Sequence, residues 1–248
     1  MKDDRIFRNM QALEFTFDTI PGLTAYTSGE TPMHSALFII IVTEGSREEI
    51  EYIRYVQQLL KEKEVTTFEV VVLNDFVANR KARISASNPM QRLNLMLDWK
   101  HKNLNVSEAD VQDEDWLICD RDDDSFKERQ YDKILRITER DGIHFIVSNP
   151  AFQLWLLFHF EGNLNRLNLH TYSSSREQLT VVENELKNHV PDYEHGSLDM
   201  NKFAPYIRNA IVNSQNYTMD IRELKTHVGS NFSDLLLDIQ TKSGMDLY

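Results

Sequence analysis

Short apolar runs alternate with segments of helical spacing between residues 36 and 162. The runs 36–43, 67–73, 115–119 and 143–147 are mostly apolar and rich in β-branched residues, which is typical of strands covered on both faces in a parallel sheet. After each run, apolar residues recur three or four positions apart, as in an amphipathic helix. The alternation therefore predicts an α/β fold, a mainly parallel sheet flanked by helices.

Local signals mark where several of these helices begin and end. Ser46 and Glu49 stand three residues apart as a capping box for the first helix. Asn88, followed by proline, predicts the cap of the second, and Gly142 predicts the end of the third. The sequence 148–150, Ser-Asn-Pro, is interpreted as strand exit, helix cap and first helical residue.

The character of the chain changes at two places. Residues 1–35 mix apolar and polar positions with prolines and glycines, and are interpreted as an irregular lead-in. Residues 36–162 form the α/β core. Residues 163–248 show apolar faces at helical spacing separated by proline and glycine, so we predict a C-terminal helical region.

Composition limits the class of protein. The 248 residues with 41% hydrophobic content suffice for one large domain. No run is long enough to cross a bilayer and the start lacks a secretory pattern, so we expect a cytoplasmic protein without membrane contact. The single cysteine, Cys119, lies in an apolar run; we expect it to be buried, and one thiol excludes a disulfide framework. The net charge of −12 argues against broad electrostatic adhesion to nucleic acid, but not against a nucleic-acid enzyme with a metal site.

Carboxylates follow two of the predicted strands directly. Glu44 comes first after run 36–43, and Asp120 comes first after run 115–119, with Asp122 and Asp124 at alternate positions behind it. Ligands of an open parallel sheet gather at the carboxyl ends of its strands, so these acids would converge if the two strands are neighbours. Such oxygen ligands suit Mg²⁺ first and Mn²⁺ second.

Other interpretations of the acids fit less well. An EF-hand loop beginning at Asp120 would need glycine at its sixth and glutamate at its twelfth position, but the chain has Ser125 and Tyr131 there. A phosphatase with an aspartate nucleophile usually has Thr or Val where Asp124 stands, and stays a distant alternative. A solvated acidic turn is the plain alternative for an isolated acidic run, and we assign Asp123 to it.

The motifs resemble a known family. A strand ending in Glu44-Gly45 and another ending in the Asp120, Asp122, Asp124 pattern resemble the Toprim catalytic core. More narrowly, residues 41–45, 120–123 and 148–160 resemble the RloB family, which includes AbiLii-like abortive-infection proteins. The chain departs from the family pattern at two places. It has Gln153 where the family usually has Glu, and Glu48 where it usually has Thr.

The resemblance implies a metal-dependent nuclease of anti-phage defence that cleaves DNA or RNA, tRNA included, and acts with a separately encoded ABC- or AAA-type ATPase. Glu44 would serve as general acid or base and as a metal ligand, while Asp120 and Asp122 would hold Mg²⁺ with help from Asp124.

The residues that would contact the substrate are Arg47, Ser148 and Asn149.

Two alternatives remain open at this stage. The first is a regulatory or scaffold protein whose Toprim-like core binds a partner or nucleotide without cutting. The second is phosphoryl or nucleotidyl transfer, as in primases. His159, among aromatic residues on an apolar helix, is interpreted as a hydrogen-bonded core histidine.

Overall fold

A computed structural model describes residues 37–45, 47–73, 88–103, 113–123, 126–246 and 248. The chain divides into two compact units, residues 1–35 and 36–248, and every described residue belongs to the second. The predicted lead-in over 1–35 lies outside the described residues, as do Ser46, Asp124 and Ser125.

A five-stranded sheet forms the centre of the second unit. Its strands are β1 (Leu37–Thr43), β2 (Phe68–Val72), β3 (Glu114–Asp120), β4 (His144–Asn149) and β5 (Gly229–Ser230), in the order β2-β1-β3-β4-β5. The first four strands pair in parallel, and β5 pairs antiparallel with β4. The predicted α/β class and its four strands are confirmed. The two-residue β5 was not predicted, because it is too short to carry an apolar pattern.

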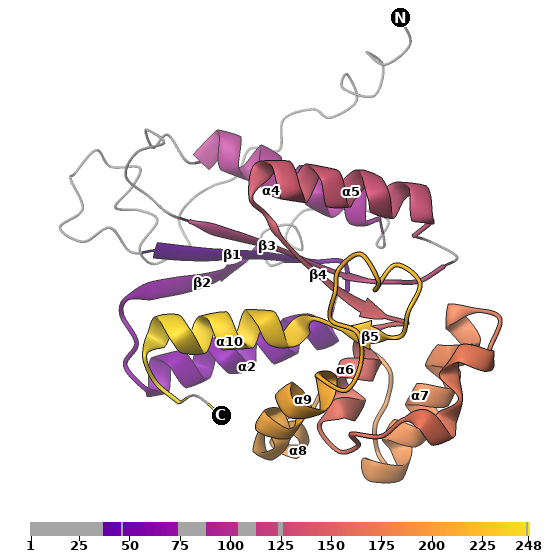
Figure 1. Ribbon diagram of the computed structural model, residues 1–248. Helices are drawn as coiled ribbons and strands as arrows, with labels where there is room; N and C mark the ends of the chain where they lie inside the picture. Colours follow the sequence, from indigo (N-terminus) through magenta and orange to yellow (C-terminus); the bar gives the residue numbers. More distant parts are fainter. Residues whose placement is uncertain (1–36, 46, 74–87, 104–112, 124–125, 247) are drawn as a thin grey trace, which may run out of the picture. The chain divides into compact units, whose positions relative to one another are not determined.

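Helices cover both faces of the sheet. On one face lie α4 (Pro89–Asn103) and α5 (Glu128–Asp141), and on the other lie α2 (Glu48–Glu62) and α10 (Phe232–Ser243) (Figure 1). Because both faces are covered, the middle of each strand is a continuous apolar run, as at residues 38–42 of β1 and 116–119 of β3, rather than an alternating pattern. Tyr52 of α2 makes edge-to-face ring contacts with Phe152, Trp155 and Phe232, which joins α2, α10 and the segment after β4 in one core.

The segment after β4 is helical as far as residue 214. It comprises α6 (Phe152–Phe158), the 3₁₀ turns η2 (Asn165–Leu167) and η3 (Leu169–Thr171), α7 (Ser175–His189), α8 (Met200–Phe203), η4 (Ala204–Tyr206) and α9 (Ile207–Ser214). The buried helix α6 packs against α7 and α9. The predicted helices of the C-terminal region are thus present, whereas a domain boundary at residue 162 stays a prediction.

Of the four predicted helix signals, two are confirmed, one is wrong, and the capping box depends on Ser46, which lies outside the described residues. The Asn88 Oδ1 atom accepts a hydrogen bond of 3.0 Å from the backbone N–H of Met90, and Gly142 ends α5 with a φ of 68°. The predicted cap at 148–150 is wrong, because β4 continues through Asn149 and the following helix starts only at Phe152. Pairing with β5 holds Asn149 in an extended strand, where it cannot cap a helix.

The core position predicted for His159 is confirmed. Its ring is fully buried, and Nδ1 lies 3.2 Å and 3.1 Å from the carbonyl oxygens of Trp155 and Leu156. Since carbonyls only accept, Nδ1 carries the proton and Nε2 accepts from the Tyr52 hydroxyl at 3.1 Å. Burial lowers the pKa of His159 to about 4, so the ring is neutral. Cys119 is buried, also as predicted.

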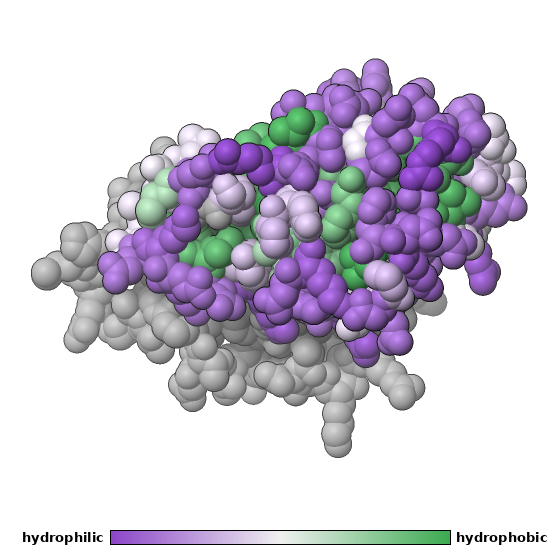
Figure 2. All heavy atoms as spheres, turned by 90° about the horizontal axis from the view of Figure 1, so that it is seen from below, coloured by the Kyte–Doolittle hydropathy of each residue, from purple (hydrophilic) through white to green (hydrophobic). Residues whose placement is uncertain are grey.

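Large apolar side chains exposed among the described residues are scattered: Tyr172, Tyr206, Val212 and Leu237. Among the described residues, no helix has the length and apolar character needed to span a membrane. Seen from the side of α2 and α10, the described surface is mainly hydrophilic with separate apolar areas (Figure 2), which is ordinary for a protein surface.

Candidate active site

The strand order places Glu44 and Asp120 on neighbouring strand ends. β1 and β3 are adjacent, with Thr43 opposite Ile118, and the backbone N–H of Glu44 extends this pairing by donating to the Ile118 carbonyl oxygen at 2.8 Å. The chain leaves β1 toward β2 on one side, while β3 lies on the other. The strand order reverses between them, and open α/β sheets bind their ligands at such a switch point.

Glu44 is buried there without full hydrogen bonding. The residue is 6% exposed, and its Oε2 atom has no hydrogen-bond partner among the described residues. Burial raises the pKa of Glu44 to about 7. The charges of Glu49 and Asp122 add to this increase, while the backbone N–H of Asp120 and the charge of Arg92 oppose it. Glu44 can therefore gain or lose a proton near neutral pH.

Asp120 ends β3 beside Glu44. Its Oδ1 atom accepts a hydrogen bond of 2.9 Å from the backbone N–H of Phe152, the first residue of α6. Burial, followed by the charges of Glu49 and Glu44, raises the pKa of Asp120 well above its usual range. The carboxylates of Glu44, Glu49 and Asp120 thus lie close enough to repel one another.

Glu49 also belongs to this acid group, although it was not among the predicted site residues. Its buried carboxylate lies against Gly45, so that a Cβ on Gly45 would stand 2.0 Å from Glu49 Oε2. Burial raises the pKa of Glu49, and the charge of Glu48 adds to the effect. In the sequence Glu49 had been interpreted as the acid of a capping box, not as a member of the acid group. The signal available in the sequence was its place in the helix that directly follows Glu44, five positions further on.

Arg92 is the buried cation of the site and was also missed. It projects from α4, is 7% exposed, and its Nη2 atom lies 3.5 Å from the Glu44 carbonyl oxygen. Burial lowers the pKa of Arg92, and the nearby charges of Glu44 and Glu49 oppose that shift. Arg92 partly offsets the negative charge of the acids. A lone arginine on a helix gave no sequence signal for this role.

A second polar cluster lies beside the first. Gln153 Nε2 donates to Glu48 Oε2 at 2.5 Å, and the Tyr193 hydroxyl donates to Glu48 Oε1 at 2.5 Å. Burial raises the pKa of Glu48. The carboxylate absent at position 153 is therefore present one hydrogen bond away, on α2.

The structure separates the other predicted site residues from the acid group to different degrees. Asp122 is partly buried and close enough to raise the pKa of Glu44. Arg47 is exposed at the start of α2. The Ser148 hydroxyl lies 2.8 Å from that of Ser230, and Asn149 Nδ2 donates to the Leu224 carbonyl oxygen at 2.9 Å.

Both Ser148 and Asn149 therefore hold the C-terminal segment, and substrate contact by either stays a prediction. Asp123 is exposed and paired with Arg121 Nη1 at 2.7 Å, in keeping with its assignment as a surface acid. Asp124 lies outside the described residues.

The donor set fits a hard divalent cation in its chemistry. Within the described part of the chain, no three His, Cys, Asp or Glu side chains are grouped so as to hold a metal ion, but Mg²⁺ is commonly bound through one or two carboxylates, with waters and substrate oxygens completing its shell. Glu44 and Asp120 are the pair that would hold it. The unpartnered Glu44 oxygen and the mutual repulsion of the acids are what a cation would relieve.

Comparison with known proteins supplies a family but no named relative. No curated protein and no solved structure gave a match. The wider resemblance to Toprim cores stays a prediction. A family model described as RloB-like protein matches residues 39–239, from β1 into α10, and so includes both strand ends of the candidate site and the segment 148–160. The chain therefore belongs to the RloB-like protein family.

Proposed function

We propose that this protein is a Mg²⁺-dependent nuclease that hydrolyses phosphodiester bonds in nucleic acid. The observation that carries the proposal is the buried Glu44 carboxylate, with one unpartnered oxygen, beside Asp120 at the switch point of the sheet. A buried acid cluster costs stability in the absence of a cation. Catalytic sites are where such costs are commonly found.

Each residue of the site has a task in this reaction. When bound, Mg²⁺ would stabilise charge on the phosphate and lower the pKa of a water molecule. Glu44, whose pKa lies at about 7, would move a proton as general acid or base. Asp120, oriented by the Phe152 N–H, would hold the cation. Arg92 would keep the acid group from excess negative charge, and the exposed Arg47 would contact a phosphate.

The biological setting rests on the family resemblance. It supports a role in anti-phage defence together with a separately encoded ABC- or AAA-type ATPase, which would act as partner or gate. Metal chemistry on a phosphate is indifferent to the attached base, so DNA and RNA, tRNA included, are both substrates to test.

The test is a cleavage assay with matched variants. Purified protein, alone and with the ATPase encoded by a neighbouring gene, is incubated with single- and double-stranded DNA, RNA and tRNA in Mg²⁺ or Mn²⁺. Glu44→Gln should lower the cleavage rate roughly 10²- to 10⁴-fold, the usual contribution of a general acid or base, and Asp120→Asn should lower metal affinity. Glu128→Gln, an exposed carboxylate change at the start of α5, should leave the rate unchanged.

Two outcomes would contradict the proposal. Cleavage that persists unchanged in Glu44→Gln and Asp120→Asn would exclude this site. Absence of cleavage under every condition, together with no Mg²⁺ or Mn²⁺ uptake in calorimetry, would favour the regulatory or scaffold alternative.

A further inference from the structure

A pocket of about 450 Å³ lies between Asp123 and described residues of the C-terminal region, from Leu164 to Val228. Asp123, which directly follows Asp122, forms one part of its lining. The backbone N–H of Asp123 donates to Ser175 Oγ at 3.1 Å, which ties the loop to the first residue of α7. The volume falls within the roughly 300–1,000 Å³ of small-molecule sites. The pocket therefore lies beside the segment that carries Asp120 and Asp122, and it is large enough for part of a substrate.

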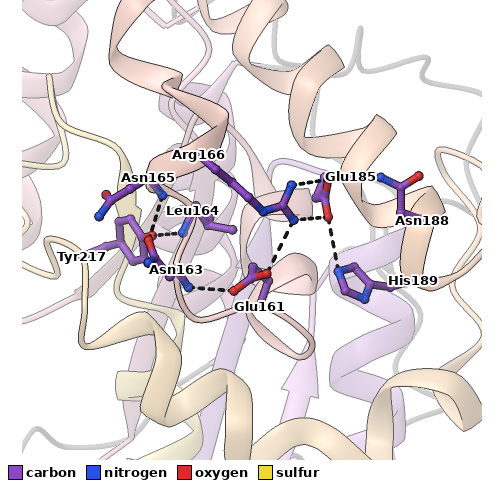
Figure 3. A network of polar contacts seen from close by, with 9 residues as sticks. All are labelled: Glu161, Asn163, Leu164, Asn165, Arg166, Glu185, Asn188, His189 and Tyr217. Atoms are coloured by element: carbon purple, nitrogen blue, oxygen red, sulfur yellow. Dashed lines mark hydrogen bonds and ion pairs between the residues drawn. The ribbon is translucent and has the colours of Figure 1, made fainter.

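One wall of the pocket is held in place by a polar network (Figure 3). The backbone N–H of Leu164 donates to the Tyr217 hydroxyl at 2.5 Å. Close by, Arg166 pairs with Glu185 of α7 and lies 3.5 Å from Glu161. Segments far apart in sequence are thereby fixed against each other. A preformed wall lowers the ordering cost of binding.

The pocket lining combines aromatic rings with side-chain amides. Tyr172 is 38% exposed, and Tyr217, His170 and His227 also line the space. Gln178 donates through Nε2 to the Leu169 carbonyl oxygen at 3.0 Å, which leaves its Oε1 atom as an acceptor. Proteins recognise unpaired bases by stacking them on such rings and by hydrogen-bonding their edges to polar side chains.

The charge of the lining argues against a phosphate in this pocket. No lysine or arginine is among its lining residues in the described part of the chain, and Asp123 contributes a carboxylate. The Asp123 carboxylate is already paired with Arg121, so the described lining offers a phosphate no lysine or arginine of its own, whereas a planar, uncharged ring system needs none.

We propose that this pocket binds a nucleobase. The base belongs to an unpaired nucleotide of the nucleic-acid strand whose phosphate would lie at Glu44 and Asp120. The proposal rests on the proposed nuclease function for its source of the base. A free nucleotide offers the same chemistry, and the test separates the two sources.

The test measures binding by the full-length protein in a chelator, so that no cleavage occurs. The probes are short fluorescent single-stranded DNA and RNA, strands of equal length that lack bases, and nucleoside monophosphates as competitors. Tyr172→Ala should weaken binding of the base-containing strands at least about fivefold, the usual effect of losing one stacking contact, and should not alter binding of the abasic strand. Tyr172→Phe should bind like the wild type. Tyr206→Ala, which removes another exposed tyrosine away from the pocket, should have no effect.

The outcomes separate the pocket from the catalytic site. Displacement of the strand by monophosphates with retention of the Tyr172 effect supports the nucleobase site, and monophosphate binding without strand binding assigns it to a free nucleotide. The proposal is overturned if the wild type binds neither probe, if it binds abasic and base-containing strands equally, or if Tyr206→Ala weakens binding as much as Tyr172→Ala. Base-dependent binding without any cleavage in Mg²⁺ would refute the proposed nuclease activity and support the nucleobase pocket. Cleavage that is unaffected by Tyr172→Ala would support the nuclease activity and refute the pocket.

Discussion

Replacing Glu44 by glutamine should flatten the pH dependence of stability of the metal-free protein. In the folded state the pKa of Glu44 is raised from 4.5 to about 7. Between these two pH values the folded chain keeps a proton that the unfolded chain has released. Stability therefore falls as the pH rises from about 4.5 to about 7. The stability that protonated Glu44 contributes is fully present below about pH 4.5 and is lost above about pH 7.

The size of the effect follows from the shift. About 2.5 pKa units correspond to roughly 3 kcal/mol of unfolding free energy. For a chain of this length that is a change of roughly 6–12 °C in melting temperature. The amide also places N–H donors where the unpartnered Oε2 atom was, so the absolute stability of the variant changes at every pH as well. The slope against pH, rather than the absolute stability, is therefore the quantity to compare.

Thermal and urea unfolding in a chelator, from about pH 5 to about pH 8, would measure that slope. We expect the wild type to lose stability with rising pH and Glu44→Gln to lose clearly less. Glu128→Gln removes the same charge from an exposed position and should keep the wild-type slope. Equal slopes in the wild type and Glu44→Gln would refute the assignment of Glu44 as a buried, repelled carboxylate.

Three further substitutions test the packing around the site, each by urea unfolding at neutral pH. Gly229→Ala would place a Cβ 2.1 Å from the Thr218 carbonyl oxygen and should cost about 1–3 kcal/mol; wild-type stability would show that β5 is not held there. Arg121→Met removes hydrogen bonds to two backbone carbonyls and should cost about 2–3 kcal/mol, and a neutral result would mean that those carbonyls are solvated. Tyr52→Phe removes the donor to His159 Nε2 and should cost about 1–3 kcal/mol; wild-type stability of this variant would contradict the assigned hydrogen bond.

Only part of the acid group could be predicted from local sequence patterns. Glu44 and Asp120 could be predicted because each follows an apolar run directly, and the ends of parallel strands share an edge. The role of Arg92 could not be recognised, because it depends on how α4 packs against β1, and that of Glu49 becomes visible only once α2 is packed on the sheet. Burial, which dominates every pKa shift of the site, is likewise a property of the assembled layers.

The role of the segment 148–150 was decided in the same way. Its residues are typical of a strand exit followed by a capped helix, yet pairing with Gly229 keeps Asn149 in the strand. Gly229 and Ser230 are far away in the sequence, so a local motif cannot predict that they pair with Asn149 and Ser148.

The sequence by itself determined the α/β class, the four parallel strands, the acids at two strand ends and the buried His159, because burial along a single element imposes its own spacing of apolar residues. Only the tertiary structure decided which strands are neighbours, that β5 completes the sheet, which buried charges face Glu44, and where a pocket opens beside Asp123. These features arise from contacts between distant segments, and such contacts leave no period in the chain.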